Sequence, residues 1–367
     1  MRRPRVGIIG AGQLGRMMAL AAYPLGIECR FVDTEADSPG GQIGPIRCAA
    51  LDDLDALTAM AHEVDVVTFD IENVSVTALE ALTKIVPVQP NPAIVALAQD
   101  RLAEKQLFES LSIPTARYVA IDSEADLARA ARELGWPIVL KARRLGYDGR
   151  GQRIVGGEAE LAAAYEDLGR LPSIAEAWVE FERELSLIGV RGSDAQTRFY
   201  PLSENVHRDG ILESSIAPYD DKALQASAEA SMTEMMQRHD YTGILTIEFF
   251  ATADGLVANE IAPRVHNSGH WTIEGAATSQ FENHIRAILG LPLGSTAVRG
   301  VAAMRNLIGR MPARPSLLAI EGAHLHDYGK SARPGRKLGH VTLLAASKHE
   351  AVERLAAVAK AVDSASG

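Results

Sequence analysis

Along residues 5–89, short continuous apolar runs alternate with segments in which apolar residues recur at helical spacing. The apolar runs predict strands and the periodic segments predict helices. We expect strands at residues 5–10, 28–33, 64–69 and 86–89, and helices at residues 13–25, 51–61 and 76–84. Because strands that alternate with helices form parallel sheets covered on both faces, this part of the chain is predicted to be an α/β domain.

The pattern changes at QPNP (residues 89–92), which ends this alternation. Beyond it we expect a helix at 100–111 with Asp100 as its N-cap, then a compact βαβ-like stretch at 115–182. Long strands follow in 183–290, with a methionine-rich helix near 222–239 and a hairpin over 244–261. From about residue 300, short strands lead to a last helix at 349–361, so the chain as a whole is α+β.

The composition limits the possible partners. The 367 residues include 37 Lys and Arg against 47 Asp and Glu, a net charge of −10, whereas a general nucleic-acid binder needs a basic face. No apolar run approaches the ~20 residues of a membrane span. Two cysteines, Cys29 and Cys48, exclude a disulfide framework and a cysteine-based zinc site. The N-terminal segment reads as a first strand and turn rather than a signal peptide, so we expect a cytoplasmic protein.

The first candidate motif, Gly10-Ala-Gly-Gln-Leu-Gly15, fits GxGxxG between a predicted strand and a predicted helix, and Asp33 ends the next strand. This arrangement is typical of a dinucleotide site, where the helix N-terminus binds pyrophosphate and the acid binds a ribose hydroxyl. The glycines can also serve a tight turn without any ligand. The rest of the sequence disfavours a dinucleotide site, because a second set of phosphate-binding features follows instead of a hydride-transfer domain.

That second set begins with the strand WPIVLK (136–141) and the loop GYDGRGQ (146–152). Three glycines let backbone N–H groups form a concave nest for an anion, and Lys141 offers a positive charge to the same phosphates. Read separately, Lys141 could reach solvent from the strand end, and the loop could be a flexible connection. Together they favour a nucleotide site.

An adenine needs an apolar slot with backbone hydrogen-bonding groups, and a ribose needs a carboxylate. The segment PSIAEAWV (172–179) ends a short predicted strand before Glu184, which is spaced to supply the carboxylate. An exposed acidic strand residue is the alternative for Glu184.

The predicted hairpin contains two glutamates that face each other. If its turn, ATADG (251–255), centres on Asp254, Glu248 and Glu260 lie directly opposite on one face of the sheet. Like charges at that spacing repel unless a cation joins them, and two carboxylates plus nucleotide phosphates are a usual Mg²⁺ site. The alternative is a solvated acidic face, which the apolar neighbours of the two glutamates disfavour.

The loop APRVHNSGHWT (262–272) follows Glu260 directly. Its cationic, imidazole and small polar side chains are not typical of a core. Structural hydrogen bonding by His266 and His270 is one interpretation, but the position beside the predicted metal pair favours contact with a substrate.

Taken in order, GYDGRGQ, ENVHRDGIL (204–212), NEIAPRVHNSGHWT (259–272) and RPGRKLGHV (333–341) closely resemble the 5-(carboxyamino)imidazole ribonucleotide synthase family. These are ATP-grasp enzymes of bacterial and fungal purine synthesis, and the likeness runs from Gly10 to about Val341. The resemblance implies a Rossmann-like domain at 1–99 that binds no dinucleotide, an ATP-grasp region at 100–298 with a lid at about 115–182, and a small β-rich C-terminal domain at 299–367.

The resemblance also implies the roles of individual residues. The metal carboxylates are Glu248 and Glu260, and the carboxylation site includes Tyr147, Arg264, His266, Asn267 and Ser268. Lys330, Arg336 and Lys337 are the implied cations for the substrate phosphate. The implied ATP contacts are Arg101, Lys141, Gly146, Tyr147, Asp148, Gly149, Arg150, Gly151, Gln152, Glu176, Ala177, Trp178, Val179, Glu184, His207, Asn259 and Glu260. In the substrate-side segment 68–74, Asp70 stands where the family more often has Glu, which leaves the role of that position open.

The implied reaction carboxylates 5-aminoimidazole ribonucleotide with ATP and bicarbonate, through carboxyphosphate, and requires ATP and Mg²⁺. Either His266 or Tyr147 could move the proton. The family further implies a homodimer and a functional link to the mutase that uses the product. The competing hypotheses are an NAD(P)-dependent oxidoreductase, which depends on the glycine motif and Asp33 alone, and another ATP-grasp ligase that uses formate or biotin.

Overall fold

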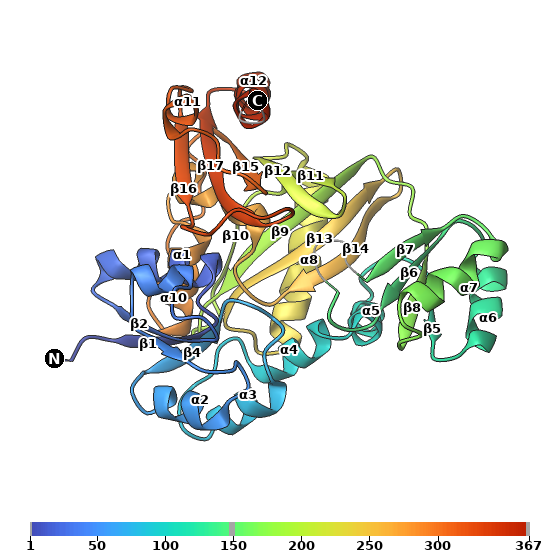
Figure 1. Ribbon diagram of the computed structural model, residues 1–367, viewed down its shortest axis with the longest axis horizontal. Helices are drawn as coiled ribbons and strands as arrows, with labels where there is room; N and C mark the ends of the chain where they lie inside the picture. The colour runs from blue at the N-terminus through green and yellow to red at the C-terminus, as the bar shows by residue number, and fades with distance from the viewer. Residues whose placement is uncertain (1, 147–150, 365–367) are drawn as a thin grey trace.

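Three β-sheets organise the computed structural model, which describes residues 2–146 and 151–364 (Figure 1). The N-terminal sheet has four strands, the central sheet nine, and the sheet of the smaller lobe four. In Figure 1 the smaller lobe, made of residues near 115–180, projects from one side of the body, the N-terminal sheet lies at the opposite side, and the C-terminal strands extend at the top. Among the described residues, no helix combines the length and apolar character needed to cross a membrane.

The N-terminal sheet is parallel, in the order β3-β2-β1-β4. Its strands are β1 (Arg5–Ile9), β2 (Glu28–Asp33), β3 (Ile46–Cys48) and β4 (Val66–Phe69). The predicted strand at 86–89 is wrong, since only a single bridge joins Val88 to Val67. Pro87 has no N–H to donate there, which limits pairing, so β4 is the last strand on this side of the sheet and β3 forms the other edge.

Short helices cover this sheet and lead into the next region. They are α1 (Gln13–Ala22), η1 (Tyr23–Leu25), η2 (Pro39–Gln42), α2 (Leu54–Ala61), α3 (Val76–Leu82), α4 (Pro92–Ala98) and α5 (Arg101–Ser110). The predicted N-cap is confirmed, because the Asp100 carboxylate accepts from the backbone N–H groups of Leu102 and Ala103. Asn91 caps α4 in the same way, so QPNP introduces a helix that the sequence pattern did not predict.

The glycine-rich turn between β1 and α1 is closed by two carboxylates of the chain itself. Asp33 accepts from the Ala11 N–H at 2.5 Å, and Asp70 accepts from the Gly12 N–H at 2.6 Å and the Gly15 N–H at 3.3 Å. Gly10 has φ +89°, and a Cβ there would lie 1.9 Å from Asp70 Oδ1. The turn therefore needs glycine for backbone conformation and for the close approach of Asp70.

The smaller lobe contains the sheet β5-β8-β6-β7, in which every neighbouring pair is antiparallel. Its elements are β5 (Tyr118–Ile121), α6 (Glu124–Leu134), β6 (Ile138–Ala142), β7 (Gln152–Val155), α7 (Glu158–Asp167) and β8 (Ser173–Ala177). β5 and β6 run in the same direction across α6, as the βαβ-like pattern predicts, but β8 lies between them. The lobe has a hydrophobic cluster of its own, with Leu127, Leu140 and Leu161 among its members.

The central sheet runs in the order β14-β13-β9-β11-β12-β15-β17-β16, with β10 paired to β9. Its strands are β9 (Arg183–Arg191), β10 (Thr197–Phe199), β11 (Ser203–Arg208), β12 (Ile211–Ala217), β13 (Gly243–Thr252), β14 (Gly255–Ala262), β15 (Val301–Ile308), β16 (Ala323–Asp327) and β17 (Lys337–Ala345). The remaining helices are α8 (Lys222–Arg238), η3 (Asn267–Gly269), α9 (Thr272–Gly275), α10 (Gln280–Ile288), α11 (Arg314–Leu318) and α12 (Lys348–Ser364). The C-terminal part is β-rich as expected, and its strands continue the central sheet through the β12–β15 pair.

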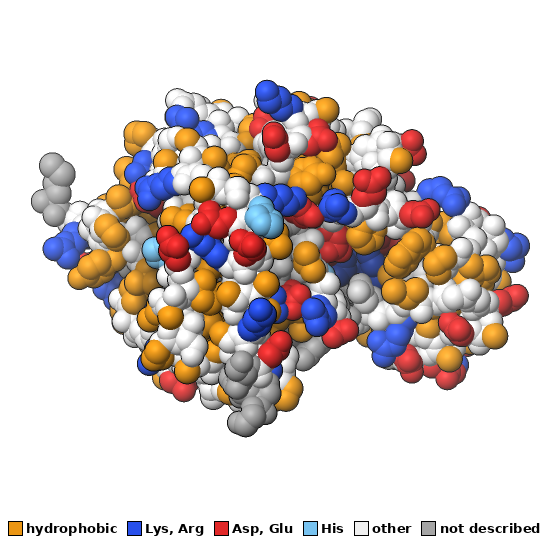
Figure 2. Space-filling model, turned by 90° about the horizontal axis from the view of Figure 1, so that it is seen from above, with side chains coloured by type: hydrophobic (Ala, Val, Ile, Leu, Met, Phe, Trp, Pro, Cys, Tyr) orange, Lys and Arg blue, Asp and Glu red, His pale blue; other side chains and the backbone are white. Residues whose placement is uncertain are grey.

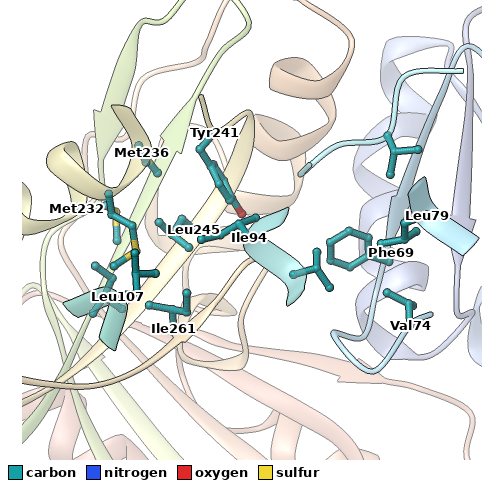
Figure 3. Packing of buried hydrophobic residues seen from close by; sticks show 14 of the residues in the cluster. Phe69, Val74, Leu79, Ile94, Leu107, Met232, Met236, Tyr241, Leu245 and Ile261 are labelled. Atoms are coloured by element: carbon teal, nitrogen blue, oxygen red, sulfur yellow. The ribbon is translucent and has the colours of Figure 1, made fainter. Parts of the chain in front are cut away.

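One hydrophobic cluster joins the N-terminal domain to the central sheet. Figure 3 shows Phe69 and Leu79 of the first domain at one side and Met232 of α8 at the other, with Ile94 of α4 between them. Each of these side chains is fully buried. Because the interior is continuous, packing holds the first domain against the central sheet. Each Å² of apolar surface buried between them stabilises this arrangement by about 25 cal/mol.

We predict that Gly10→Ala destabilises the protein by more than about 3 kcal/mol, because the left-handed backbone cost of ~1–2 kcal/mol adds to the collision with Asp70. Gly26→Ala is the matched control: Gly26 has φ +72° with open space around it, so it should lose only the backbone cost. Urea unfolding followed by circular dichroism measures both. Equal losses in the two variants would show that the Asp70 contact is unimportant.

Candidate active site

A cavity of about 760 Å³ lies where the three sheets meet. In Figure 2, acidic and basic side chains meet in the hollow between the smaller lobe and the body. Most of the predicted site residues line this cavity, although they come from segments far apart in the sequence. Those that line it are Arg101, Lys141, Gly146, Gln152, Glu176, Ala177, Trp178, Val179, Glu184, His207, Glu248, Asn259, Glu260, Arg264, His266, Asn267 and Lys337.

Some predicted residues lie elsewhere. Gly151, Ser268, Lys330 and Arg336 do not line the cavity. The predicted contacts Tyr147, Asp148, Gly149 and Arg150 fall outside the described residues. Gly151, at the end of that loop, has φ +74°, a conformation that glycine adopts without strain.

The end of the cavity beside the smaller lobe is apolar. Phe181 and Phe250 stack with ring centroids 4.6 Å apart, and Val139, Ile154 and Trp178 line the same region. Glu184 lies next to this slot, and its Oε2 is 2.6 Å from His207 Nδ1. Burial lowers the pKa of His207, but Glu184, Glu248 and Glu260 together raise it more, so the net pKa is above its ordinary value. An aromatic slot that ends in a carboxylate suits a nucleoside.

Beyond this slot lies a buried chain of charges. Glu176 on β8 contacts Lys141 Nζ at 2.9 Å and Lys105 Nζ at 3.4 Å. Burial alone would raise the pKa of Glu176, but the two ammonium groups lower it to about 2. Burial lowers the pKa of Lys141, with Glu176 opposing that shift. This chain places a lysine charge at the cavity wall, where a phosphate would neutralise it.

Lys105 is a residue that the sequence analysis missed. It is 1% exposed, and its Nζ donates to Thr115 Oγ1 at 3.0 Å and to the Asn259 carbonyl at 2.9 Å. It therefore joins α5, the smaller lobe and β14, and removing one partner from a buried ion pair typically costs 3–5 kcal/mol. The available signal was its spacing: Lys105 lies one helical turn after Arg101 on α5.

The two hairpin glutamates lie opposite each other, as the sequence predicts, although for a partly different reason. The turn is the two residues between Thr252 and Gly255, so it does not centre on Asp254. A bulge at Asn259 then shifts the register by one residue and brings Glu248 opposite Glu260. The pairing of the two carboxylates thus depends on the bulge.

The electrostatics of this pair suit a cation. Burial and the neighbouring Glu260 raise the pKa of Glu248 to about 7. Burial also acts to raise the pKa of Glu260, but Arg101, 3.0 Å away, and Lys141 together lower it below its ordinary value. The buried Asn259 Oδ1, on the bulge, has no hydrogen-bond partner among the described residues. No group of three or more acidic, His or Cys side chains among the described residues could hold a metal, so a cation here would need oxygen ligands from a bound molecule. The residues fit Mg²⁺ shared with a nucleotide.

The opposite end of the cavity carries Arg264, which forms a close ion pair with Glu72. Burial raises the pKa of Glu72, but Arg264 lowers it to about 2. Both acids of segment 68–74 line the cavity, but they have different partners: Asp70 accepts from the glycine-rich turn, and Glu72 pairs with Arg264. Burial raises the pKa of Asp70 to about 6.

Asn267 and His266 complete this end. Asn267 exchanges two hydrogen bonds with Asn306 of β15, at 3.1 and 2.7 Å, which ties the loop to the C-terminal strands. His266 Nε2 lies 3.4 Å from Glu248 Oε1. Burial, with Arg264 and Lys337 nearby, lowers the pKa of His266 well below its ordinary value.

The basic segment 330–337 approaches the cavity rim. Lys337 lines the cavity, and the Lys330 ammonium donates to Gln13, which also lines it. Arg336 donates to Ser331 Oγ at 2.9 Å. Burial lowers the pKa of Lys330 to about 8, and Arg336 adds to the shift. These positive charges at the rim repel one another, and an anionic group such as a phosphate would offset that repulsion.

The same geometry argues against a dinucleotide at the glycine motif. The N–H groups of residues 11, 12 and 15 already donate to Asp33 and Asp70. A pyrophosphate there would meet the Asp70 carboxylate at the N-terminus of α1. Gly12 and Leu14 instead line the cavity described above.

Three family models match the chain: the ribonucleotide synthetase preATP-grasp domain over residues 3–99, the ATP-grasp domain over 106–281, and the phosphoribosylaminoimidazole carboxylase C-terminal domain over 302–354. The N5-carboxyaminoimidazole ribonucleotide synthase of Pseudomonas aeruginosa is 48% identical, covering 96% of this chain and 98% of its own. That of Brucella melitensis is 44% identical, covering 92% and 95%.

Solved structures show the same likeness. The N5-carboxyaminoimidazole ribonucleotide synthetase of Thermus thermophilus superposes with a TM-score of 0.93 at 47% identity, covering 97% of this chain and 98% of its own. The Aspergillus clavatus synthase, in complex with ADP and 5-aminoimidazole ribonucleotide, gives a TM-score of 0.92 at 33% identity and covers 99% of both chains.

Proposed function

The chain belongs to the N5-carboxyaminoimidazole ribonucleotide synthase family of ATP-grasp enzymes, and on this premise we propose that its cavity uses ATP and bicarbonate to carboxylate 5-aminoimidazole ribonucleotide. The products are N5-carboxyaminoimidazole ribonucleotide, ADP and phosphate. The observation that carries the proposal is that one cavity holds an apolar nucleoside slot, a lysine for phosphates, a carboxylate pair and a cationic anion-binding end.

The chemistry explains why these features must lie together. Bicarbonate is a poor electrophile, and transfer of the γ-phosphoryl group of ATP makes carboxyphosphate. The substrate amine then attacks the carbon of carboxyphosphate, or of the CO₂ that it releases. Protein groups have to place the reactants and offset the charge of the transferring group, since phosphoryl transfer needs little else from an enzyme. Water has to be excluded, because carboxyphosphate hydrolyses.

In this proposal ATP lies between the smaller lobe and the central sheet. The base occupies the slot lined by Phe181 and Phe250, and Glu184 binds the ribose. Lys141 and the loop 146–152 bind the phosphates, with Arg101 and His207 beside them. Mg²⁺ would be held by Glu248 and Glu260, where it would offset charge on the phosphates.

The substrates meet at the other end. Arg264, whose charge Glu72 holds in position, and Asn267 bind bicarbonate in line with the phosphoryl group. Lys330, Arg336 and Lys337 bind the 5′-phosphate of the ribonucleotide. The family resemblance implies three further properties, which we include in the proposal. The protein is cytoplasmic, it forms a homodimer, and its product is used by a mutase.

The direct test measures ADP release by the purified protein. We expect release that requires both 5-aminoimidazole ribonucleotide and bicarbonate, and none when formate replaces bicarbonate. We also expect no saturable change in NADH fluorescence at sub-millimolar concentration. Formate-dependent release would favour another ATP-grasp ligase, and tight NADH binding that depends on Asp33 would favour an oxidoreductase.

Glu260→Gln tests the metal pair. It keeps the size of the side chain but removes one charge, so turnover should fall about a hundredfold or more while the fold survives. The measurement is ADP release across a Mg²⁺ titration, with circular dichroism as the folding control. Asp254→Asn, at the exposed turn of the same hairpin, should leave turnover unchanged. Near-normal turnover of folded Glu260→Gln at low Mg²⁺ would remove Glu260 from the metal site.

Arg336→Ala tests the phosphate site. Loss of one charge-assisted contact should raise the KM for the ribonucleotide about tenfold or more and leave the KM for ATP nearly constant. Arg310→Ala, which removes an arginine of the C-terminal part that pairs with Asp363, is the control and should change neither constant. An equal rise in both constants for Arg336→Ala would contradict the assignment.

A further inference from the structure

His266 is held at the carboxylation end of the cavity by its backbone. Its N–H donates to Gln280 Oε1 at 3.0 Å, and its carbonyl accepts from Gln280 Nε2 at 2.6 Å. Gln280 is fully buried, so this clamp fixes the residue but leaves the ring to be oriented by other contacts.

The contacts of the ring determine which nitrogen carries the proton. The backbone N–H of Ser268 points at His266 Nδ1, at 3.3 Å, and Ser268 Oγ lies 2.9 Å from the same nitrogen. A backbone N–H can only donate, so Nδ1 is an acceptor and holds no proton. A ring that holds no proton on Nδ1 carries its proton on Nε2, which faces Glu248 Oε1.

A buried chain of hydrogen bonds extends from Ser268 into the central sheet. Ser186 Oγ on β9 donates to Ser268 Oγ at 2.7 Å, and Asn205 Nδ2 on β11 donates to Ser186 Oγ at 3.0 Å. Ser215 Oγ on β12 donates to Asn205 Oδ1 at 2.8 Å. None of these four residues is more than 5% exposed.

The protons of this chain have one consistent arrangement. Ser186 has a single hydroxyl proton, which it gives to Ser268, and it accepts from Asn205 and from Ser203, 2.9 Å away. Ser268 already accepts from Ser186, so its own proton is directed to His266 Nδ1. Every donor along the chain thus points toward His266.

We propose that the chain Ser215–Asn205–Ser186–Ser268 holds His266 as the neutral tautomer protonated on Nε2, so that His266 serves the carboxylation site as a hydrogen-bond donor and not as its base. The substrate group that accepts from His266 Nε2–H is an anionic oxygen of bicarbonate or carboxyphosphate. This part of the inference rests on the proposed function. Ser268, Ser186 and Asn205 are then positioning residues, and Ser268 acts through His266 instead of touching the substrate.

The tautomer can be measured without any turnover. In protein labelled with ¹⁵N-histidine, long-range proton–nitrogen spectra distinguish the two neutral tautomers and the imidazolium form, and His266→Gln assigns the signal by removing it. We expect the wild-type ring to be neutral and protonated on Nε2. A wild-type ring that is doubly protonated, or protonated on Nδ1, would overturn the proposal whatever the enzyme catalyses.

The chain itself is tested with Ser186→Ala and Ser268→Ala, which remove one hydroxyl without adding volume. We expect an Nδ1-protonated form of His266 to become detectable and kcat to fall about tenfold or more, with the KM for ATP unchanged. The control is Thr246→Val on β13, which removes a fully buried hydroxyl that has no hydrogen-bond partner among the described residues. Thermal unfolding checks that all three variants fold.

The outcomes separate the two proposals. If wild-type protein releases no ADP that depends on the ribonucleotide, the proposed function fails, while the nitrogen spectra still decide the tautomer. Thr246→Val should keep the wild-type tautomer and the wild-type kcat. If the wild type is active and both serine variants also keep that tautomer and that kcat, the proposal that the chain positions His266 is overturned.

Discussion

The buried contact of Glu176 with two lysines is the constraint on which the site depends. A carboxylate that is 3% exposed is costly unless it is paired, and Glu176 is paired on both sides, by Lys141 and Lys105. Lys105 also binds the backbone of β14, on which Glu260 lies. The position of the smaller lobe, the lysine charge at the phosphate end and the carboxylate pair are therefore linked through one network, and a change in any of them alters the electrostatics of the others.

The parts of the fold that the sequence predicted are those governed by local patterns. The parallel N-terminal sheet, the helix capped by Asp100 and the glutamate hairpin follow from periodicity and from cap and turn chemistry. The failures have local causes too: prolines removed the expected strand at 86–89, and a three-residue edge strand, β3, was too short to give a pattern. The bulge at Asn259 was not predictable, because pairing register depends on both strands of the hairpin.

The types of residue in the site were predictable, but the ion pairs and hydrogen bonds between them were not. Motifs indicated Lys141, Glu248, Glu260 and Arg264, since a charged or polar residue in a glycine-rich or strand-end context is a local signal. Lys105, the Arg264–Glu72 pair and the serine chain behind His266 involve partners tens to hundreds of residues apart, so no window of sequence contains them. The glycine motif correctly predicted a tight turn between a strand and a helix. Whether that turn binds a ligand depends on Asp70, 58 residues after Gly12, which accepts from the N–H group of Gly12.

The division of the interior has a consequence for how such sequences diverge. The N-terminal domain and the central sheet share one cluster, in which Ile94 lies between Phe69 and Met232, whereas the smaller lobe encloses its own. An altered side-chain volume at Ile94 has to be compensated on two sides at once, so substitutions there are coupled across both domains. Residues such as Leu127 and Leu161 belong to the cluster of the lobe alone, so substitutions there need compensation only within the lobe. We therefore expect the lobe core to drift faster among relatives than the shared core, although both surround the same cavity.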